Sequence, residues 1–286
     1  MNSGANKLSW TDRAILLTVA KVAKQTLVLE VLTENYGRCR AIASLDGSEA
    51  PVLLPGSFLR IHCTGDGLGQ PMQAKLLEIS GGIIAETPDD IGIIALSCTK
   101  DLMAMFLEVE DPVPEIYDAT HTMMQSLVAD DDRWPVHYAL VEFAILTELG
   151  HITGMSECMP AFRHGDAIYL SPKTARAVPR ERAGAFLDRL IPMPGLLLGQ
   201  RNASLIEVRQ ALDLTEMVLQ RFALPSSESN ALPAGRQDLI QALNIMEQIP
   251  KASVVVPISP EDEQLRRRRL MESKPLMVAG RGAGAG

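Results

Sequence analysis

The feature that most constrains the fold is a series of short aliphatic and β-branched runs in the first eighty positions. Runs of this length and composition are typical of strands, and turn signals such as Asn35–Arg38 and Pro55–Gly56 separate them. We expect strands at 14–20, 26–33, 38–44, 55–63 and 72–79. So many short strands in so few residues predict a small barrel.

From about residue 89 the apolar residues recur at helical spacing. We expect helical segments at 89–107, 114–129, 131–150, 180–190, 204–223 and 235–249. The clearest of them has one apolar face that we expect to be buried, made by Trp134, Tyr138, Val141, Ile145 and Leu149.

These two periodicities predict an α+β chain with two domains. Residues 1–80 are expected to form a five-stranded OB-fold barrel, because the OB-fold is the common barrel of that size. Residues 81–250 are expected to form an α-helical domain. The end of the chain, 251–286, has the composition of a disordered basic tail.

The net charge of −8 comes from one segment, 81–134, which carries 12 acidic and 2 basic residues. The remainder is nearly balanced, so the overall acidity is compatible with a local cationic surface. The N-terminal stretch MNSGANKLSW has no apolar region of the kind found in secretory signals. No apolar run approaches the ~20 residues that span a bilayer. We expect a cytoplasmic protein that does not engage a membrane.

The motifs of common catalytic and metal sites are missing from the sequence. The segment 65–70 lacks the Lys-Ser/Thr of a phosphate-binding loop, and 154–158 lacks the last glycine of a nucleophile elbow. The cysteines form no C-x-x-C pair, so we expect reduced core thiols at Cys39, Cys63, Cys98 and Cys158. We predict no enzyme, no metal and no cofactor. The enzyme alternative is a metal hydrolase that uses His151, Cys158 and His164.

Binding is the function that remains. An OB-fold holds single-stranded nucleic acid with a cationic groove and aromatic platforms. The candidate DNA-binding cations of the barrel are Lys21, Lys24, Arg38, Arg40, Arg60 and Lys75. Trp10, Tyr36 and Phe58 are candidate stacking residues; the alternative is that Phe58 belongs to the core and that Trp10 packs the barrel end. Scattered, solvated charge is the alternative interpretation of the cations.

Six stretches of the sequence resemble one protein family. They are WTDRAILL (10–17), LEVLTENYGR (29–38), VLLPGSFL (52–59), WPVHYALVEFAILTELG (134–150), YLSPKTARAV (169–178) and DRLIPMPGLLL (188–198). Together they make the chain similar to the RecO family of bacterial recombination mediators, most of all to its alphaproteobacterial form, over roughly residues 10–200.

The resemblance implies an OB-fold barrel packed on a helical domain. It also implies a part in DNA repair, DNA damage responses and recombination by the RecF pathway. The implied activities are the binding of single- and double-stranded DNA and the annealing of complementary strands. The implied partners are RecR, the single-strand-binding protein SSB with its acidic C-terminal tail, and further along the pathway RecF and RecA.

Two departures from the family pattern change the expectations. Many members carry a four-cysteine zinc module where this chain has only Cys158, so we predict no zinc. The loop 42–56 carries Asp46 and Glu49 where the family usually has a basic loop, and acidic groups there would weaken phosphate binding. The alternative function is therefore an OB-fold adaptor that contacts proteins and binds little DNA directly.

A second cationic stretch, YLSPKTARAVPRER (169–182), lies in the predicted helical domain. Its cations, also candidate DNA-binding residues, are Lys173, Arg176, Arg180 and Arg182. Three roles are open for them: phosphate contacts, recognition of the acidic SSB tail, or pairing with the acidic segment 81–134.

Overall fold

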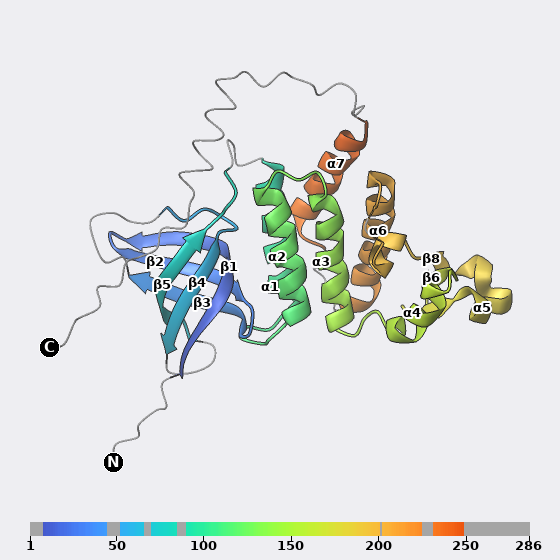
Figure 1. The fold of residues 1–286 in the computed structure, drawn as a ribbon, viewed down its shortest axis with the longest axis horizontal. Coiled ribbons are helices and arrows are strands. Elements are labelled where there is room, and N and C mark those ends of the chain that lie inside the picture. The colour runs from blue at the N-terminus through green and yellow to red at the C-terminus, as the bar shows by residue number, and fades with distance from the viewer. Residues whose placement is uncertain are drawn as a thin grey trace, which may run out of the picture. The chain divides into compact units, whose positions relative to one another are not determined.

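Five strands form a closed barrel in the first part of the computed structural model, which describes residues 8–44, 52–65, 70–84, 90–200, 202–224 and 231–248 (Figure 1). The strands are β1 (Leu8–Ala23), β2 (Thr26–Thr33), β3 (Gly37–Ser44), β4 (Phe58–Gly65) and β5 (Met72–Ser80). Their order around the barrel is β1-β2-β3-β5-β4. Only the β3–β5 pair is parallel among these neighbours. The predicted five-stranded OB-fold is confirmed.

Strand β1 is longer than the sequence predicted, because it begins at Leu8 rather than near residue 14. Its first half pairs with β4 and alternates exposed and buried positions. Asp12 occupies one of the buried positions, so this half contains no aliphatic run. The Asp12 carboxylate accepts hydrogen bonds from the backbone and side-chain amides of Asn35, at 2.8 and 2.9 Å. It thereby ties β1 to the turn between β2 and β3.

The barrel core is built from the inward residues of every strand. Trp10, Leu16, Leu29, Val31, Ile61 and Met72 are among them. Cys39 and Cys63 belong to the same cluster, and burial raises the pKa of each thiol to about 12. These two cysteines therefore act as small apolar side chains.

The segment Glu108–Pro114 returns to the barrel and runs beside β3. Val109 pairs with Arg38, and the backbone N–H of Glu110 donates to the Arg38 carbonyl at 2.8 Å. Gly37 has a φ of 65°, and a Cβ there would collide with the carbonyl oxygen of Asp111. Because β3 pairs with β5 only over 41–43, this segment covers the part of the β3 edge that β5 leaves open.

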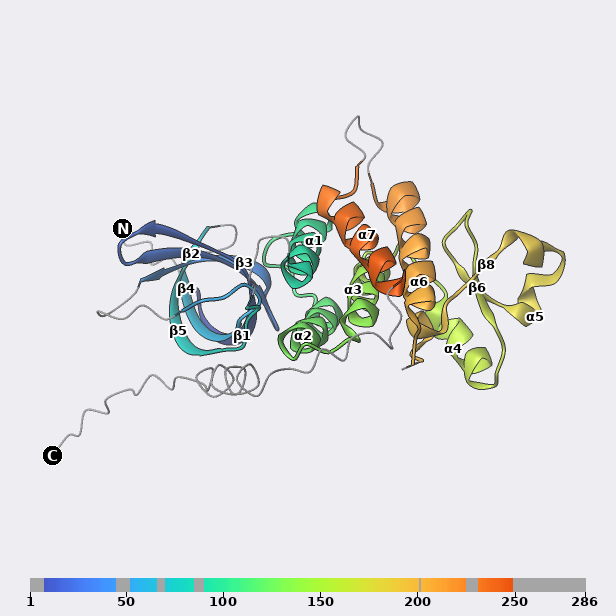
Figure 2. The same ribbon diagram turned by 90° about the horizontal axis from the view of Figure 1, so that it is seen from above.

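A second compact unit contains the helices and comprises the described residues of 86–107 and 115–249. Its long helices are α1 (Ile91–Phe106), α2 (Pro114–Val128), α3 (Trp134–Glu148), α6 (Leu205–Val218) and α7 (Ala234–Gln248). Helix α3 packs against α1 and α6, and α7 packs against α1 (Figure 2). No helix in the described part of the chain is long and apolar enough to cross a membrane.

The helix starts follow local sequence. The Asp90 side chain accepts the backbone N–H of Gly92 at 2.8 Å and caps α1. Ser204 and Glu207 form a reciprocal capping box at the start of α6. Helix α6 continues as a π-helical turn, η3 (Leu219–Ala223). These elements lie within the predicted helical segments, apart from a difference of one residue at the start of α7.

The predicted apolar face of α3 is buried over four of its five positions. Trp134 is 6% exposed, and Tyr138, Val141 and Ile145 are almost fully enclosed. Leu149 caps the helix end and is only half-buried. Because α3 ends at Glu148, no further helical turn covers the Leu149 side chain.

A buried ion pair joins three helices. The Glu142 carboxylate of α3 accepts hydrogen bonds from Nε and Nη2 of Arg236 on α7, at 2.7 and 3.0 Å. Both side chains are at most 2% exposed. The Tyr138 and Thr215 hydroxyls also donate to Glu142, at 2.8 and 2.5 Å. Burial and the neighbouring Glu142 raise the pKa of Tyr138, which stays a neutral donor.

Arg236 has further acceptors in α6. It donates from Nη1 to Glu216 at 2.6 Å and from Nη2 to the Leu212 carbonyl at 2.8 Å. Burial alone would lower the pKa of Arg236, but Glu142 outweighs it and raises that pKa further. The guanidinium therefore stays charged and satisfied inside the bundle.

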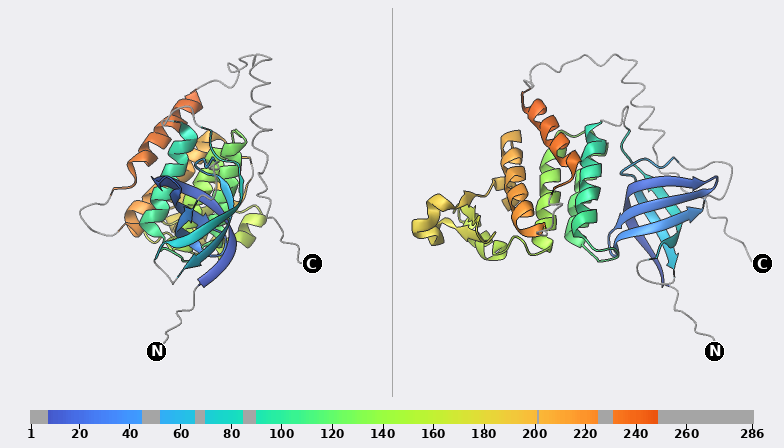
Figure 3. Two further views of the ribbon diagram at one scale, coloured as in Figure 1. Left: turned by 90° about the vertical axis from the view of Figure 1, so that its left-hand side faces the viewer. Right: turned by 180° about the vertical axis from the view of Figure 1, so that it is seen from behind.

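Between α3 and α6 the chain forms a small mixed structure that we call the lobe, residues 151–194 (Figure 3). It contains α4 (Met155–Arg163), α5 (Arg180–Ala183), the 3-10 helix η1 (Gly184–Arg189), and a sheet of β6 (Ile168–Leu170), β7 (Ala177–Pro179) and β8 (Ile191–Pro192). A further 3-10 helix, η2 (Gly195–Leu198), follows it. A single helix over 180–190 is wrong, because Gly184 leaves helical geometry at φ 51° and ψ −132°.

Arg236→Met tests the buried pair. It leaves the Glu142 charge in the core without its cation, so unfolding in urea should show a loss of about 3–5 kcal/mol. The double change Arg236→Met with Glu142→Gln removes the charge and should recover part of that loss. Arg176→Met, which breaks a surface pair with Glu157 whose side chains are about half exposed, should cost less than about 1 kcal/mol. Equal losses for Arg236→Met and Arg176→Met would contradict this account.

Thiol reactivity tests the burial of the cysteines. Burial raises the pKa of Cys39, Cys63 and Cys98 to about 12 and also raises that of Cys158. Because the thiolate is the reactive form, the native protein should react with an aromatic disulfide reagent at pH 8 only slowly. All four thiols should react at once in denaturant. Fast reaction of one thiol in native protein would show that it is accessible.

Candidate nucleic-acid interface

Three cationic side chains and a histidine gather on the outer face of β1, β4 and β5. The register places Arg13 of β1 opposite Arg60 of β4, and His62 of β4 opposite Lys75 of β5. Outward positions alternate with core positions along each strand, so these side chains share one face. We call Arg13, Arg60, His62 and Lys75 the barrel face.

Carboxylates neutralise part of this barrel face. Arg13 makes two hydrogen bonds to Glu34, each 2.7 Å long, and its side chain is still 70% exposed. Arg60 meets Glu78 at 3.2 Å, and both side chains are more than half exposed. Such exposed pairs are weak and break easily for a stronger partner. Lys75 is exposed and makes no ion pair within the described residues.

Sequence reasoning missed Arg13. The signal was available, because Ser9, Thr11 and Arg13 alternate with Trp10, Asp12 and Ala14. That alternation is typical of a half-buried strand, but we expected the strand to begin only after Arg13.

The remaining barrel cations lie elsewhere. Lys21 and Lys24 are exposed at the tip of the β1–β2 hairpin. Arg40 is exposed on β3, opposite Glu30 of β2. Arg38 is 8% exposed, and its Nη1 meets Glu30 at 2.9 Å, beneath the returning segment Glu108–Pro114. Arg38 is therefore a structural cation in this conformation.

Two of the aromatic candidates, Trp10 and Tyr36, form a stacked pair. The rings of Trp10 and Tyr36 lie 4.2 Å apart at an interplanar angle of 11°. Trp10 is buried at the barrel end, and Tyr36 is 38% exposed. Phe58 is half-buried at the start of β4. The acidic loop positions Asp46 and Glu49 lie outside the described residues.

The cations of 169–182 are spread over several elements of the lobe. Lys173 lies in the turn between β6 and β7 and is exposed. Arg176 donates twice from Nη2 to Glu157 of α4, at 2.8 and 2.7 Å. Arg180 and Arg182 are exposed on α5. Within the described residues, none of the four pairs with the acidic segment 81–134.

The residues of the metal-hydrolase alternative do not form a cluster. Among the described residues there is no group of three His, Cys, Asp or Glu side chains that could hold a metal ion. Cys158 is 1% exposed and His164 is exposed at the end of α4. Burial lowers the pKa of His151 and keeps it neutral.

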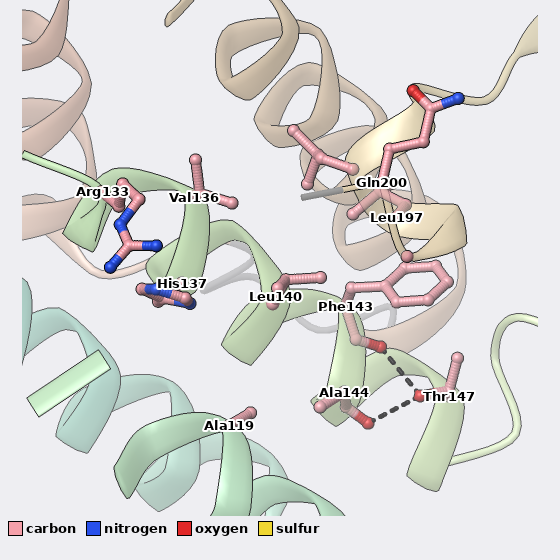
Figure 4. A pocket seen from close by; sticks show the side chains of 12 residues that line it. Ala119, Arg133, Val136, His137, Leu140, Phe143, Ala144, Thr147, Leu197 and Gln200 are labelled. Atoms are coloured by element: carbon pink, nitrogen blue, oxygen red, sulfur yellow. Dashed lines mark hydrogen bonds between the residues drawn. The ribbon is translucent and has the colours of Figure 1, made fainter. Parts of the chain in front are cut away.

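A groove of about 600 Å³ runs along the outer side of α3 (Figure 4). The helix is apolar on both sides, and the side opposite the bundle core lines the groove. The apolar lining residues are Ala119, Val136, Leu140, Phe143, Ala144, Leu196 and Leu197. Figure 4 shows Arg133 and His137 at one end and Gln200 at the other.

The charged end of this α3 groove is built by Arg133. Its guanidinium makes hydrogen bonds of 2.7–3.1 Å to Asp131, which hold the pKa of that carboxyl at about 2. The Arg133 side chain is 71% exposed. Burial lowers the pKa of His137, so this ring is neutral at pH 7. The groove thus offers apolar contacts with one exposed arginine at its mouth.

Comparison with known proteins gives one consistent result. A family model described as "Recombination protein O C terminal" matches residues 93–224. The DNA repair protein RecO of Cereibacter sphaeroides is 31% identical over 238 residues, which cover 82% of this chain and 98% of the relative. The DNA repair protein RecO of Ruegeria is 30% identical over 241 residues, with coverage of 82% and 98%. That of Caulobacter vibrioides is 28% identical over 239 residues, with coverage of 82% and 95%.

Proposed function

The chain belongs to the RecO family of DNA repair proteins, and from that premise we propose that it is a recombination mediator without catalytic activity. It binds and anneals DNA strands in the cytoplasm. Together with RecR it helps RecA to load on single strands that SSB covers. The RecF pathway is the setting, with RecF as a further partner.

The barrel face carries the DNA-binding part of this proposal. Arg13, Arg60 and Lys75 project from neighbouring strands of an OB-fold barrel, where a phosphate backbone can follow them. Their ion pairs with Glu34 and Glu78 are exposed and therefore easily exchanged for phosphates. Lys21, Lys24 and Arg40 are further candidates on the hairpin and β3.

The groove of α3 supports the proposed contact with SSB. An acidic protein tail can place a carboxylate on the arginine at the mouth of the groove, and any apolar side chains of the tail can pack on its apolar lining. Arg133 would meet that carboxylate in exchange for Asp131, and Leu140 and Phe143 would receive the apolar side chains. This location differs from the 169–182 stretch that the sequence suggested for the tail.

In the adaptor alternative, the groove still binds a protein partner, but the barrel binds little DNA directly. Its support is the neutralisation of barrel cations, because Arg38 and Arg60 are both paired with glutamates. Annealing of complementary oligonucleotides coated with the cognate SSB separates the two functions. A mediator accelerates that annealing, whereas an adaptor binds SSB and leaves the annealing rate unchanged.

Two opposite substitutions in one ion pair test the barrel face. Arg60→Gln should weaken binding to single-stranded DNA and reduce the salt slope by about 0.7. Glu78→Gln releases Arg60 and should strengthen binding at low salt. Fluorescence anisotropy with a labelled oligonucleotide measures both. If neither change alters the affinity or the slope, the barrel face does not hold DNA.

Leu140→Glu tests the groove. It places a carboxylate among the apolar contacts and should weaken binding of a labelled SSB C-terminal peptide at least about tenfold, since a buried unpaired charge costs more than 1.4 kcal/mol. Met105→Glu, at an exposed position of α1, is the matched control and should bind as the parent does. Parent-like peptide binding by folded Leu140→Glu protein would exclude this groove.

A further inference from the structure

The lobe presents an exposed aromatic ring on an ordered element. Phe186 of η1 is 62% exposed, although phenylalanine is usually buried. The backbone of η1 is held at its end by a hydrogen bond of 3.1 Å from Leu190 to Leu187, and β8 follows directly and pairs with β6. The ring is therefore held in water by a defined backbone and is free to contact a partner.

Cations flank this ring in the sequence. Arg182 and Arg189 flank Phe186 by four and three positions, and both are exposed. The other exposed cations of the lobe are Arg163, Lys173, Arg176 and Arg180.

The lobe has fewer carboxylates than cations, and two of these carboxylates already accept hydrogen bonds within the lobe. Glu157 is held by Arg176, and Asp166 accepts the backbone N–H of Glu181 at 3.4 Å. Glu181 and Asp188 are exposed on α5 and η1. The lobe is consequently cationic overall within an acidic protein, and this charge suits an anionic partner.

Arginines of two different elements lie near the same buried thiol. The positive charges of Arg182 on α5 and Arg176 beside β7 both act on the Cys158 thiol of α4 and lower its pKa, although burial, the largest effect, raises it. The backbone N–H of Arg180 donates to the Ala167 carbonyl at 2.9 Å and fixes α5 against the strand β6. This hydrogen bond positions α5, and with it Arg182, without using the Arg182 side chain.

We propose that the lobe binds one single strand of nucleic acid, with a base stacked on Phe186 and phosphates on Arg182 and Arg189. This inference rests on the proposed function and adds a second strand-binding surface to the barrel face. A single strand fits best, because it offers anionic groups and free base faces together. A duplex hides its base faces, and an acidic peptide offers charge without a flat ring.

Three variants of Phe186 test the stacking. Phe186→Ala and Phe186→Leu should each weaken binding of a labelled oligo-thymidine strand roughly tenfold with an unchanged salt slope, whereas Phe186→Trp should bind like the parent. The new tryptophan should be quenched by the strand, against the background of buried Trp10 and Trp134. Binding of a duplex should be unaffected by all three.

Charge and control variants complete the test. Arg182→Gln and Arg189→Gln should each reduce the salt slope for single strands by about 0.7. Ile206→Ala, on α6 and similarly exposed at 57%, should change nothing.

Each contrary outcome has a distinct meaning. If the parent protein binds no DNA, the proposed function and this inference both fail. If the parent binds but Phe186→Ala binds equally well, only the inference fails and the barrel face remains. If Phe186→Ala loses RecR or SSB peptide binding instead, with parent-like DNA binding, the lobe is a protein-docking surface and the inference is overturned.

Discussion

One buried carboxylate organises the helical unit. Glu142 accepts hydrogen bonds from α3, α6 and α7. Arg236, which lies 94 residues further along the chain, neutralises its negative charge. Taking both groups out of water costs several kcal/mol each, so only good geometry makes the pair tolerable. That geometry exists only when three helices adopt one relative register. We infer that the pair serves mainly to select this one arrangement of the helices.

The same arrangement produces the groove. Helix α3 is apolar around most of its circumference, and a helix of that kind needs partners on both sides. Its inner side packs against α1 and α6, around Tyr138 and Glu142. Among the described residues, its outer side faces Ala119 of α2 and the short helix η2 with the two residues after it, which leave Leu140 and Phe143 half-covered. The groove is thus a consequence of where the ion pair fixes α3.

The sequence was sufficient where structure follows local periodicity. The barrel strands with aliphatic runs and the buried side of α3 could be predicted, because neighbouring residues determine them. The first half of β1 was missed although its alternation is readable, because a carboxylate occupies a core position there: Asp12 accepts hydrogen bonds from the backbone of Arg13 and from Asn35 in the β2–β3 turn. The pairing of Glu142 with Arg236 was hidden, since no local pattern connects residues so far apart.

For the candidate site, the sequence identifies the charged residues but not whether each one is buried, paired or exposed. A list of cations is readable from sequence, but their state is not: Arg38 is buried against Glu30, whereas Lys75 is exposed. The split of the cations into a barrel face and a lobe also required the fold.

If the barrel face binds DNA as proposed, the pairing of its arginines with glutamates would keep DNA binding weak enough to be reversed. Each paired arginine must leave a glutamate before it meets a phosphate, so the net gain per contact is small and strand binding is weak and reversible. A protein that brings complementary strands together has to release the duplex it forms. A Phe186 contact made only with unpaired bases would favour that release, because its stacking partner disappears once the strands have annealed.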